Sequence, residues 1–140
     1  MDSDDPEPDG SGFELRLKAR TDAAAEARDA IRVRLSASLP TATLDDLLTV
    51  VTELVTNSVR HGPGAPIDLR VEVAADGAVR GVVADQGEGK VALRETRTPG
   101  TGGIGLRLVD SIADRWGVYE GSTHVWFELR APTAGLEARR

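Results

Sequence analysis

The sequence predicts an α/β two-layer sandwich, in which a mixed, largely antiparallel sheet is covered on one face by about three helices. The spacing of apolar residues alternates between two and about 3.6, in the order strand, helix, helix, strand, strand, helix, strand, strand. Turn signals at Asp76-Gly77 and Gly121-Ser122 join neighbouring strands as hairpins, which pair antiparallel. A chain of 140 residues, 40% of them apolar, has the size of one domain with a real core.

The first predicted elements are a strand and an Ala-rich helix. Residues 13–19 alternate apolar and polar side chains, as a half-buried strand does. The helix follows to about Leu39, with Thr21 or Asp22 as its N-cap. Pro40 then ends it, because proline cannot continue a helix.

A second helix is predicted over residues 44–61. Thr43 is a suitable N-cap, and Gly62 followed by Pro63 is a typical stop signal. This helix carries most of the polar residues that bear on function.

The second half of the domain contains two hairpins separated by a loop and a helix. Strands are predicted at 66–75 and 78–85, a polar loop at 86–101, and a third helix at 104–115. The closing hairpin comprises strands 116–121 and 123–131.

The two ends of the chain are predicted to lie outside the folded domain, which spans 13–131. Residues 1–12 carry five acids and no base, which is typical of a disordered acidic tail, and 132–140 are predicted as a loose tail. The remaining acids and bases nearly balance. A nucleic-acid partner would require a basic excess and is therefore not expected.

Composition also narrows the cellular setting. The chain has no cysteine, which excludes disulfides and thiolate metal sites. No apolar run approaches the roughly 20 residues needed to span a bilayer, and the acidic start does not resemble a signal peptide. We therefore expect a cytoplasmic protein without a membrane partner.

The stretch "TELVTNSVRH" in the second helix is the first candidate functional cluster. Glu53, Asn57 and Arg60 fall within about 60° of one another on a helix. This side of the helix is rich in short polar residues that do not favour helix: Thr49, Thr52, Thr56, Asn57 and Ser58. The pattern fits either a solvated helix face or the lining of an enclosed polar pocket.

The second cluster is "VVADQGEG". An apolar strand delivers Asp85 to its end, and Gly87 and Gly89 follow at a spacing of two. A carboxylate fixed there accepts hydrogen bonds, for example from an exocyclic base amine, while glycines admit a flat ligand close to the backbone. An ordinary turn after a strand has the same composition.

The third cluster, "GTGGIGLRLVD", is a glycine-rich loop that opens a helix. Free N–H groups at a helix N-terminus bind phosphate, although a flexible loop with a cap gives the same pattern. Gly100, Gly102 and Gly105 also match the G-x-G-x-x-G dinucleotide fingerprint, but that fingerprint needs a strand running directly into its first glycine. "RETRTP" precedes it instead, and the Walker sequence is absent, so both of those readings are rejected.

In this order, E-x-x-x-N on a helix, D-x-G-x-G after a strand and G-x-G-L at a helix start resemble the Bergerat ATP-binding fold. That superfamily includes gyrase, MutL, the large heat-shock chaperones and the histidine kinases. The resemblance covers about residues 13–131. Within it, "ELVTNSVRHG", "GIGLRLVDSIADRWGV" and "VWFEL" are most similar to the small actinobacterial branch of the anti-sigma factor serine/threonine kinases.

The resemblance implies roles for five of these residues. Asn57 would hold Mg²⁺ through its amide oxygen, and Glu53 would be the general base. Asp85 would accept a hydrogen bond from the adenine amine, with Gly87 and Gly89 at the edge of the adenine.

It also implies a phosphate cradle below a lid formed by about residues 88–101. The cradle and its neighbours would be Thr101, Gly102, Gly103, Gly105 and Leu106. Arg60 and His61 stand near the same face, where a capping role and a phosphate contact are both open.

The function implied is an ATP-dependent serine/threonine protein kinase that uses ATP and Mg²⁺. Its partners would be an anti-anti-sigma factor as substrate and a sigma factor that it sequesters, and it would form a homodimer. Some kinases of this family carry an arginine where this chain has Thr101, with Arg97 the nearest substitute. A nucleotide-dependent binding module without transfer activity, or a detached ATP-binding domain of a sensor kinase, therefore remains the alternative.

Overall fold

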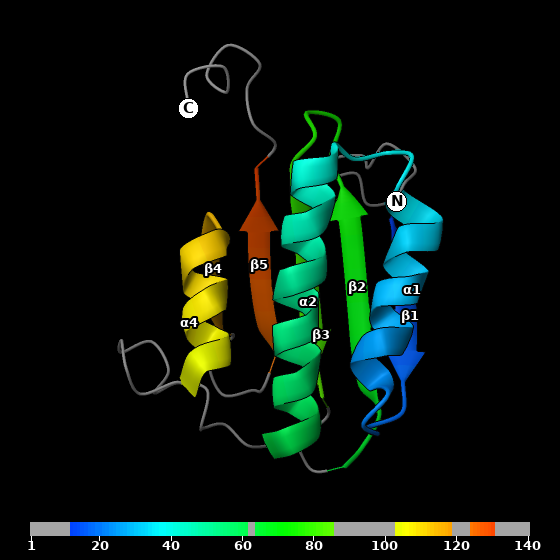
Figure 1. Cartoon of the computed structure of the whole chain (residues 1–140), viewed down its shortest axis with the longest axis vertical. Coiled ribbons are helices and arrows are strands. Elements are labelled where there is room, and N and C mark those ends of the chain that lie inside the picture. The colour runs from blue at the N-terminus through cyan, green and yellow to red at the C-terminus, as the bar shows by residue number, and fades with distance from the viewer. Residues whose placement is uncertain (1–11, 62–63, 86–102, 119–123, 131–140) are drawn as a thin grey trace, which may run out of the picture.

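The computed structural model describes residues 12–61, 64–85, 103–118 and 124–130, and of residues 103–106 only the helical backbone. The described elements follow one another in the predicted order (Figure 1). They are β1 (Phe13–Leu17), α1 (Ala23–Leu35), α2 (Thr41–His61), β2 (Ile67–Val73), β3 (Val79–Ala84), α4 (Gly103–Ile112), β4 (Arg115–Val118) and β5 (Val125–Leu129). The predicted tails and the predicted loop at 86–101 lie outside these residues, except for Gly12.

The five strands form one sheet in the order β1-β2-β3-β5-β4, and the helices cover one of its faces (Figure 1). This confirms the predicted two-layer sandwich. All four described pairings are antiparallel, so the parallel component of a mixed sheet is not found among these strands. The connection from β3 through α4 to β4 does join two strands of the same direction. Because β5 inserts between them, those two strands never pair.

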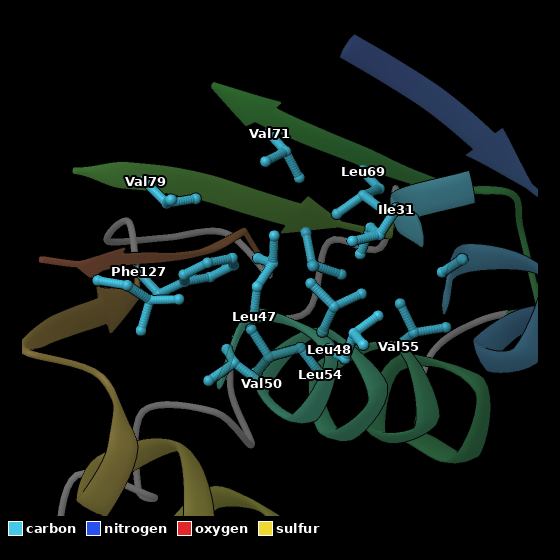
Figure 2. Close-up of a cluster of buried hydrophobic side chains, with 14 of the residues drawn as sticks. Ile31, Leu47, Leu48, Val50, Leu54, Val55, Leu69, Val71, Val79 and Phe127 are labelled. Atoms are coloured by element: carbon cyan, nitrogen blue, oxygen red, sulfur yellow. The ribbon is translucent and has the colours of Figure 1, made fainter. Parts of the chain in front are cut away.

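The core lies between the sheet and the helices. Alternate residues of β2 are buried, and they point toward the apolar side of α2 (Figure 2). Figure 2 shows this contact layer, formed by Ile31, Leu47, Leu48, Val50, Leu54, Val55, Leu69, Val71, Val79 and Phe127. Phe127 is 1% exposed and lies opposite Gly81 in the ladder, where a side chain would overlap its ring.

The hairpin predicted at Asp76-Gly77 is confirmed. Gly77 has a φ of 91°, a left-handed conformation that glycine adopts without strain. The Ala78 N–H donates to Asp76 Oδ1 at 2.9 Å, and the Ala74 N–H donates to the Ala78 carbonyl at 2.8 Å. The turn therefore sets the register in which Val73 faces Val79.

The junction between α1 and α2 differs from the prediction. Helix α1 ends at Leu35, four residues early. The Ser38 N–H donates to the Leu35 carbonyl at 2.9 Å, an i→i−3 bond that forms a tighter turn after the helix. Helix α2 begins at Thr41 rather than 44. The Leu44 N–H donates to the Pro40 carbonyl at 2.9 Å, so proline stands at the start of α2, where its missing N–H costs nothing.

Helix α4 ends at Ile112 rather than 115. The Asp114 N–H already donates to the Glu128 carbonyl of β5 at 3.0 Å, which places the chain in the sheet. No helix in the described part of the chain is long and apolar enough to cross a membrane.

Candidate functional site

Helix α2 lies between α1 and α4, so its two flanks face different neighbours (Figure 1). Arg28 of α1 donates to Thr52 Oγ1 at 3.2 Å, which identifies the flank toward α1. Glu53 and Asn57 lie about 100° and 140° from Thr52 on the helix, away from that flank. Both are half-buried, and they do not share the flank that contacts α1.

The threonines of α2 have a different explanation from the one the sequence suggested. Thr49 and Thr52 donate to the carbonyls of Asp45 and Leu48, at 3.0 and 2.6 Å. Their hydroxyls are therefore satisfied within the helix, and Thr52 faces α1. These bonds account for both threonines in a helix without a cavity, and the contact with Arg28 turns Thr52 away from the proposed pocket.

Asp85 is a buried carboxylate, 5% exposed, one residue beyond the end of β3. Alternation along the strand places it on the same face as Val79, Gly81 and Val83, the face that the helices cover. An acid is rarely buried without a specific reason. The Asp85 side chain therefore lies beneath the helix layer, at the end of the strand where the sequence predicts it.

The third cluster begins a helix, as predicted. Gly103 and Gly105 lie in the first turn of α4, where backbone N–H groups have no partner within the helix. Leu106 follows in the same helix. This first turn, the last turns of α2 and the end of β3 all lie at the lower end of the molecule in Figure 1. Helix α2 packs against both α4 and β3, which brings the three clusters to one end of the domain.

The other predicted site residues fall outside the described part of the chain. These are Gly87, Gly89, Thr101 and Gly102, together with the predicted lid at 88–101. Arg60 and His61 are exposed in the last turn of α2 and form no ion pair within the described residues. Positive charge there is favourable to the helix dipole, which supports a capping role without testing a phosphate contact.

The uncovered face of the sheet has a different character. Glu128 is buried there and is held by Arg115 at 3.5 Å and Arg80 at 4.0 Å. Two grooves of about 310 and 620 Å³ lie on this face, and neither is lined by Glu53, Asn57 or Asp85. The candidate site and these grooves are therefore on opposite faces of the sheet.

The donor set suits Mg-nucleotide better than a protein-only metal site. Among the described residues, no group of three or more His, Asp or Glu is placed to hold a metal ion. Mg²⁺ does not need one, since it is commonly held by one or two protein oxygens, water and substrate phosphates. The amide oxygen of Asn57 is a hard ligand of the required kind.

Sequence reasoning missed Asp46, which shares a stripe of α2 with Glu53 and Asn57 at a spacing of seven and eleven residues. Its side chain is exposed overall, but partial burial raises the pKa of its carboxyl, and the charges of Asp45 and Asp114 raise it further. The spacing was visible in the sequence. The approach of Asp114, which follows α4 in the chain, could not be foreseen from the sequence.

The sequence matches the family of histidine kinase-like ATPase domains over residues 17–129, and the chain belongs to this family. The Bergerat resemblance drawn from the motifs is thereby confirmed. A comparison with curated proteins found no match.

Two solved structures share the fold. One contains the RsbU and RsbW domains of Rv1364c from Mycobacterium tuberculosis, with a TM-score of 0.63 and 21% identity over 86% of this chain. The other is the histidine kinase domain of a blue-light activated histidine kinase from Erythrobacter litoralis, with a TM-score of 0.51 and 19% identity over 83% of this chain. This chain spans 31% of the first structure's chain and 62% of the second.

Replacing Asp46 by Asn should stabilise the protein at neutral pH. Because its pKa is raised in the folded state above the ordinary 3.8, the folded protein binds this proton more tightly than the unfolded chain. Ionised Asp46 therefore opposes folding above the raised pKa, and this penalty disappears as the pH falls below 3.8.

Urea unfolding of wild type and D46N, from neutral pH to below 3.8, measures this difference in stability. The variant should have the higher midpoint at pH 7, with the difference shrinking as the pH falls. A wild type that is more stable than D46N at pH 7 would show that Asp46 makes a favourable contact instead.

Proposed function

We propose that this protein binds Mg-ATP on the helix-covered side of its sheet and transfers the γ-phosphoryl group to a serine or threonine of a partner protein. The observation that carries the proposal is the burial of Asp85 at the end of β3, on the helix-covered face of the sheet, in a member of the histidine kinase-like ATPase family. A buried carboxylate in that position is suited to recognise the amine of an adenine base.

Each of the three clusters contacts a different part of the nucleotide. Asp85 accepts a hydrogen bond from the adenine amine, and Gly87 and Gly89 leave room for the edge of the base. The first turn of α4, with Gly102 before it, offers N–H groups to the phosphates. Asn57 contributes an oxygen to Mg²⁺, which neutralises charge on the phosphates as they react.

Glu53 is the proposed general base. It precedes Asn57 by one helical turn on the same side of α2 and is half-buried rather than free in solvent. Its carboxylate takes the proton of the partner hydroxyl as the oxygen attacks the γ-phosphorus. The bond from that phosphorus to the β-phosphate oxygen breaks, and ADP leaves.

The proposed partners follow from the resemblance to anti-sigma factor kinases. The substrate is an anti-anti-sigma factor, and a sigma factor is the protein that is sequestered, in the cytoplasm and with the kinase as a homodimer. The structural likeness to a chain with RsbU and RsbW domains supports this direction. The choice of these partners is based on the similarity of the sequence motifs to those of the anti-sigma factor kinases.

A second candidate is a nucleotide-dependent binding module that sequesters a partner without transferring phosphate. Thr101 favours it, because some kinases of the family carry an arginine at that position. The presence of Glu53 favours the kinase. Incubation with γ-labelled ATP and a candidate partner separates the two functions.

Replacing Asp85 by Asn should weaken ATP binding while leaving the fold intact. The amide can turn its own NH₂ toward the adenine amine, which sets donor against donor. A buried group left unpaired costs about 1–3 kcal/mol, which corresponds to roughly 5- to 150-fold in affinity. Isothermal titration with Mg-ATP measures the change.

The matched control is Asp76→Asn, the same substitution at the opposite end of the β2–β3 hairpin. Asparagine can still accept the bond from the Ala78 N–H, so this variant should bind ATP like wild type. Equal ATP affinity in wild type and D85N would place the adenine elsewhere.

Replacing Glu53 by Gln should slow phosphoryl transfer while ATP and partner binding persist. General bases typically accelerate a reaction by about 10²- to 10⁴-fold. The transition state of phosphoryl transfer is loose and depends more on positioning and Mg²⁺, so we expect the rate to fall by an amount near the lower end of this range. Asn57→Ala should instead lose Mg²⁺-dependent binding and transfer together, because an oxygen ligand of the metal is removed.

Single-turnover transfer to the partner is the measurement, with Glu14→Gln on the uncovered sheet face as the control. Transfer by E53Q at the wild-type rate would show that this carboxylate is not the base. A wild type that binds its partner and ATP but transfers to none would favour the binding module.

A further inference from the structure

Asp110 occupies an unfavourable place in α4. It lies in the last turn, where the carbonyl ends of the helix repel negative charge, and no basic residue in that turn compensates. Its carboxylate has another partner. Trp116 of β4 donates its indole Nε1–H to Asp110 Oδ1 at 2.8 Å, which joins the end of the helix to the edge strand of the sheet.

Helix α4 packs along α2, and the side chains described in it are those of residues 107–112. Val109 is fully buried, Ile112 is half-buried, and Arg107, Leu108, Asp110 and Ser111 are exposed. In this last stretch of the helix, apolar packing is confined to Val109 and Ile112. The Asp110–Trp116 hydrogen bond supplies a second, directional attachment.

Trp116 is a firm partner for this attachment. Its ring packs against the core and faces Phe127 in the β4–β5 ladder. The turn that leads into β4 is also fixed, because Asp114 accepts a hydrogen bond from the Arg130 N–H at 2.6 Å and its own N–H donates to the Glu128 carbonyl. The indole of Trp116 is therefore fixed relative to the sheet, and the hydrogen bond from it to Asp110 connects α4 to the sheet.

We propose that Asp110 is a positioning residue for nucleotide binding: through its hydrogen bond to Trp116 it fixes the direction of α4 and so the place of the phosphate-binding first turn. This inference rests on the proposed function. Seven residues of helix, about 10 Å, separate Asp110 from Gly103. A tilt of about 10° at the anchor moves the first turn by about 2 Å, while phosphate contacts require placement to within about 0.5 Å.

The test is the affinity of the full chain for Mg-ATP, by isothermal titration at a temperature where circular dichroism shows every variant folded. Asp110→Ala and Trp116→Phe each remove the bond, and each should weaken binding by about three- to tenfold. The double variant should be no weaker than the worse single variant, because both changes remove one interaction. Asp110→Asn should stay within about twofold of wild type, since its amide oxygen still accepts the indole N–H.

Two controls separate positioning from a loss of stability. Ser111→Ala, the next residue on α4, changes an exposed hydroxyl that bonds only to the Leu108 carbonyl in the described structure, and should leave affinity unchanged. Ile31→Val, in the buried face of α1, should lower the melting temperature without altering nucleotide affinity.

Fluorescence gives a readout that stability alone does not move. The sequence has two tryptophans, and Trp126 can be replaced by Phe so that Trp116 reports alone. Its emission should change when Mg-ATP binds and should respond less when Asp110→Ala is added.

The outcomes are distinct. If wild type binds no nucleotide, the proposed function fails and this inference with it. If wild type binds but D110A and W116F bind equally well, only the positioning role is overturned. The same holds if affinity falls in I31V as much as in D110A, because the effect then follows stability.

Discussion

The buried side of α2 is the constraint on which the rest of the structure depends. Its apolar residues pack onto β2, β3 and β5 at once, and α1 and α4 pack along its two flanks. A helix of 21 residues held this way cannot roll without opening the core. The polar residues of this helix therefore point in fixed directions, and the packing of Leu47, Val51 and Leu54 determines where Glu53 and Asn57 lie.

The same packing explains why two faces of one sheet differ. On the helix side, alternate strand residues are apolar up to the point where Asp85 ends the series. On the other side, β1 and β2 carry charged residues that pair across strands, such as Arg16 with Asp68 at 2.8 Å, while Val82 of β3 faces Trp126 of β5. Exposed pairs of this kind contribute little stability. The buried carboxylate at the end of β3 stands out against them, because nothing in a sheet requires an acid in that position.

Much of the fold was predictable because it depends on local periodicity. The order of elements, the hairpin at Asp76-Gly77 and the position of Asp85 after an apolar strand all follow from residues close in sequence. The absence of a parallel pairing among the described strands could not be predicted, because it depends on β5 inserting between β3 and β4. The start of α2 was misplaced because Pro40 can end one helix or begin another, and only the Leu44 hydrogen bond decides between them.

The motifs of the candidate site were predictable from the sequence, but the contacts from other elements that position them were not. Glu53, Asn57 and Asp85 are recognisable in the sequence by their spacing, and their role in binding a nucleotide stays a prediction. Thr52 was grouped with them because the sequence cannot reveal that Arg28 reaches it from α1. Asp110 drew no attention, since its value depends on Trp116, six residues away and in another element.

The proposed function requires that the helix-covered end of the domain binds the nucleotide and that the grooves on the opposite face do not. Titration of the ¹⁵N-labelled full chain with Mg-ATP, followed by amide chemical shifts, tests this most directly. The largest shifts should occur around Glu53 to Asn57, at Asp85 and in the first turn of α4. Shifts concentrated instead at Arg70, Arg80 and Trp126, with these three regions unchanged, would contradict it.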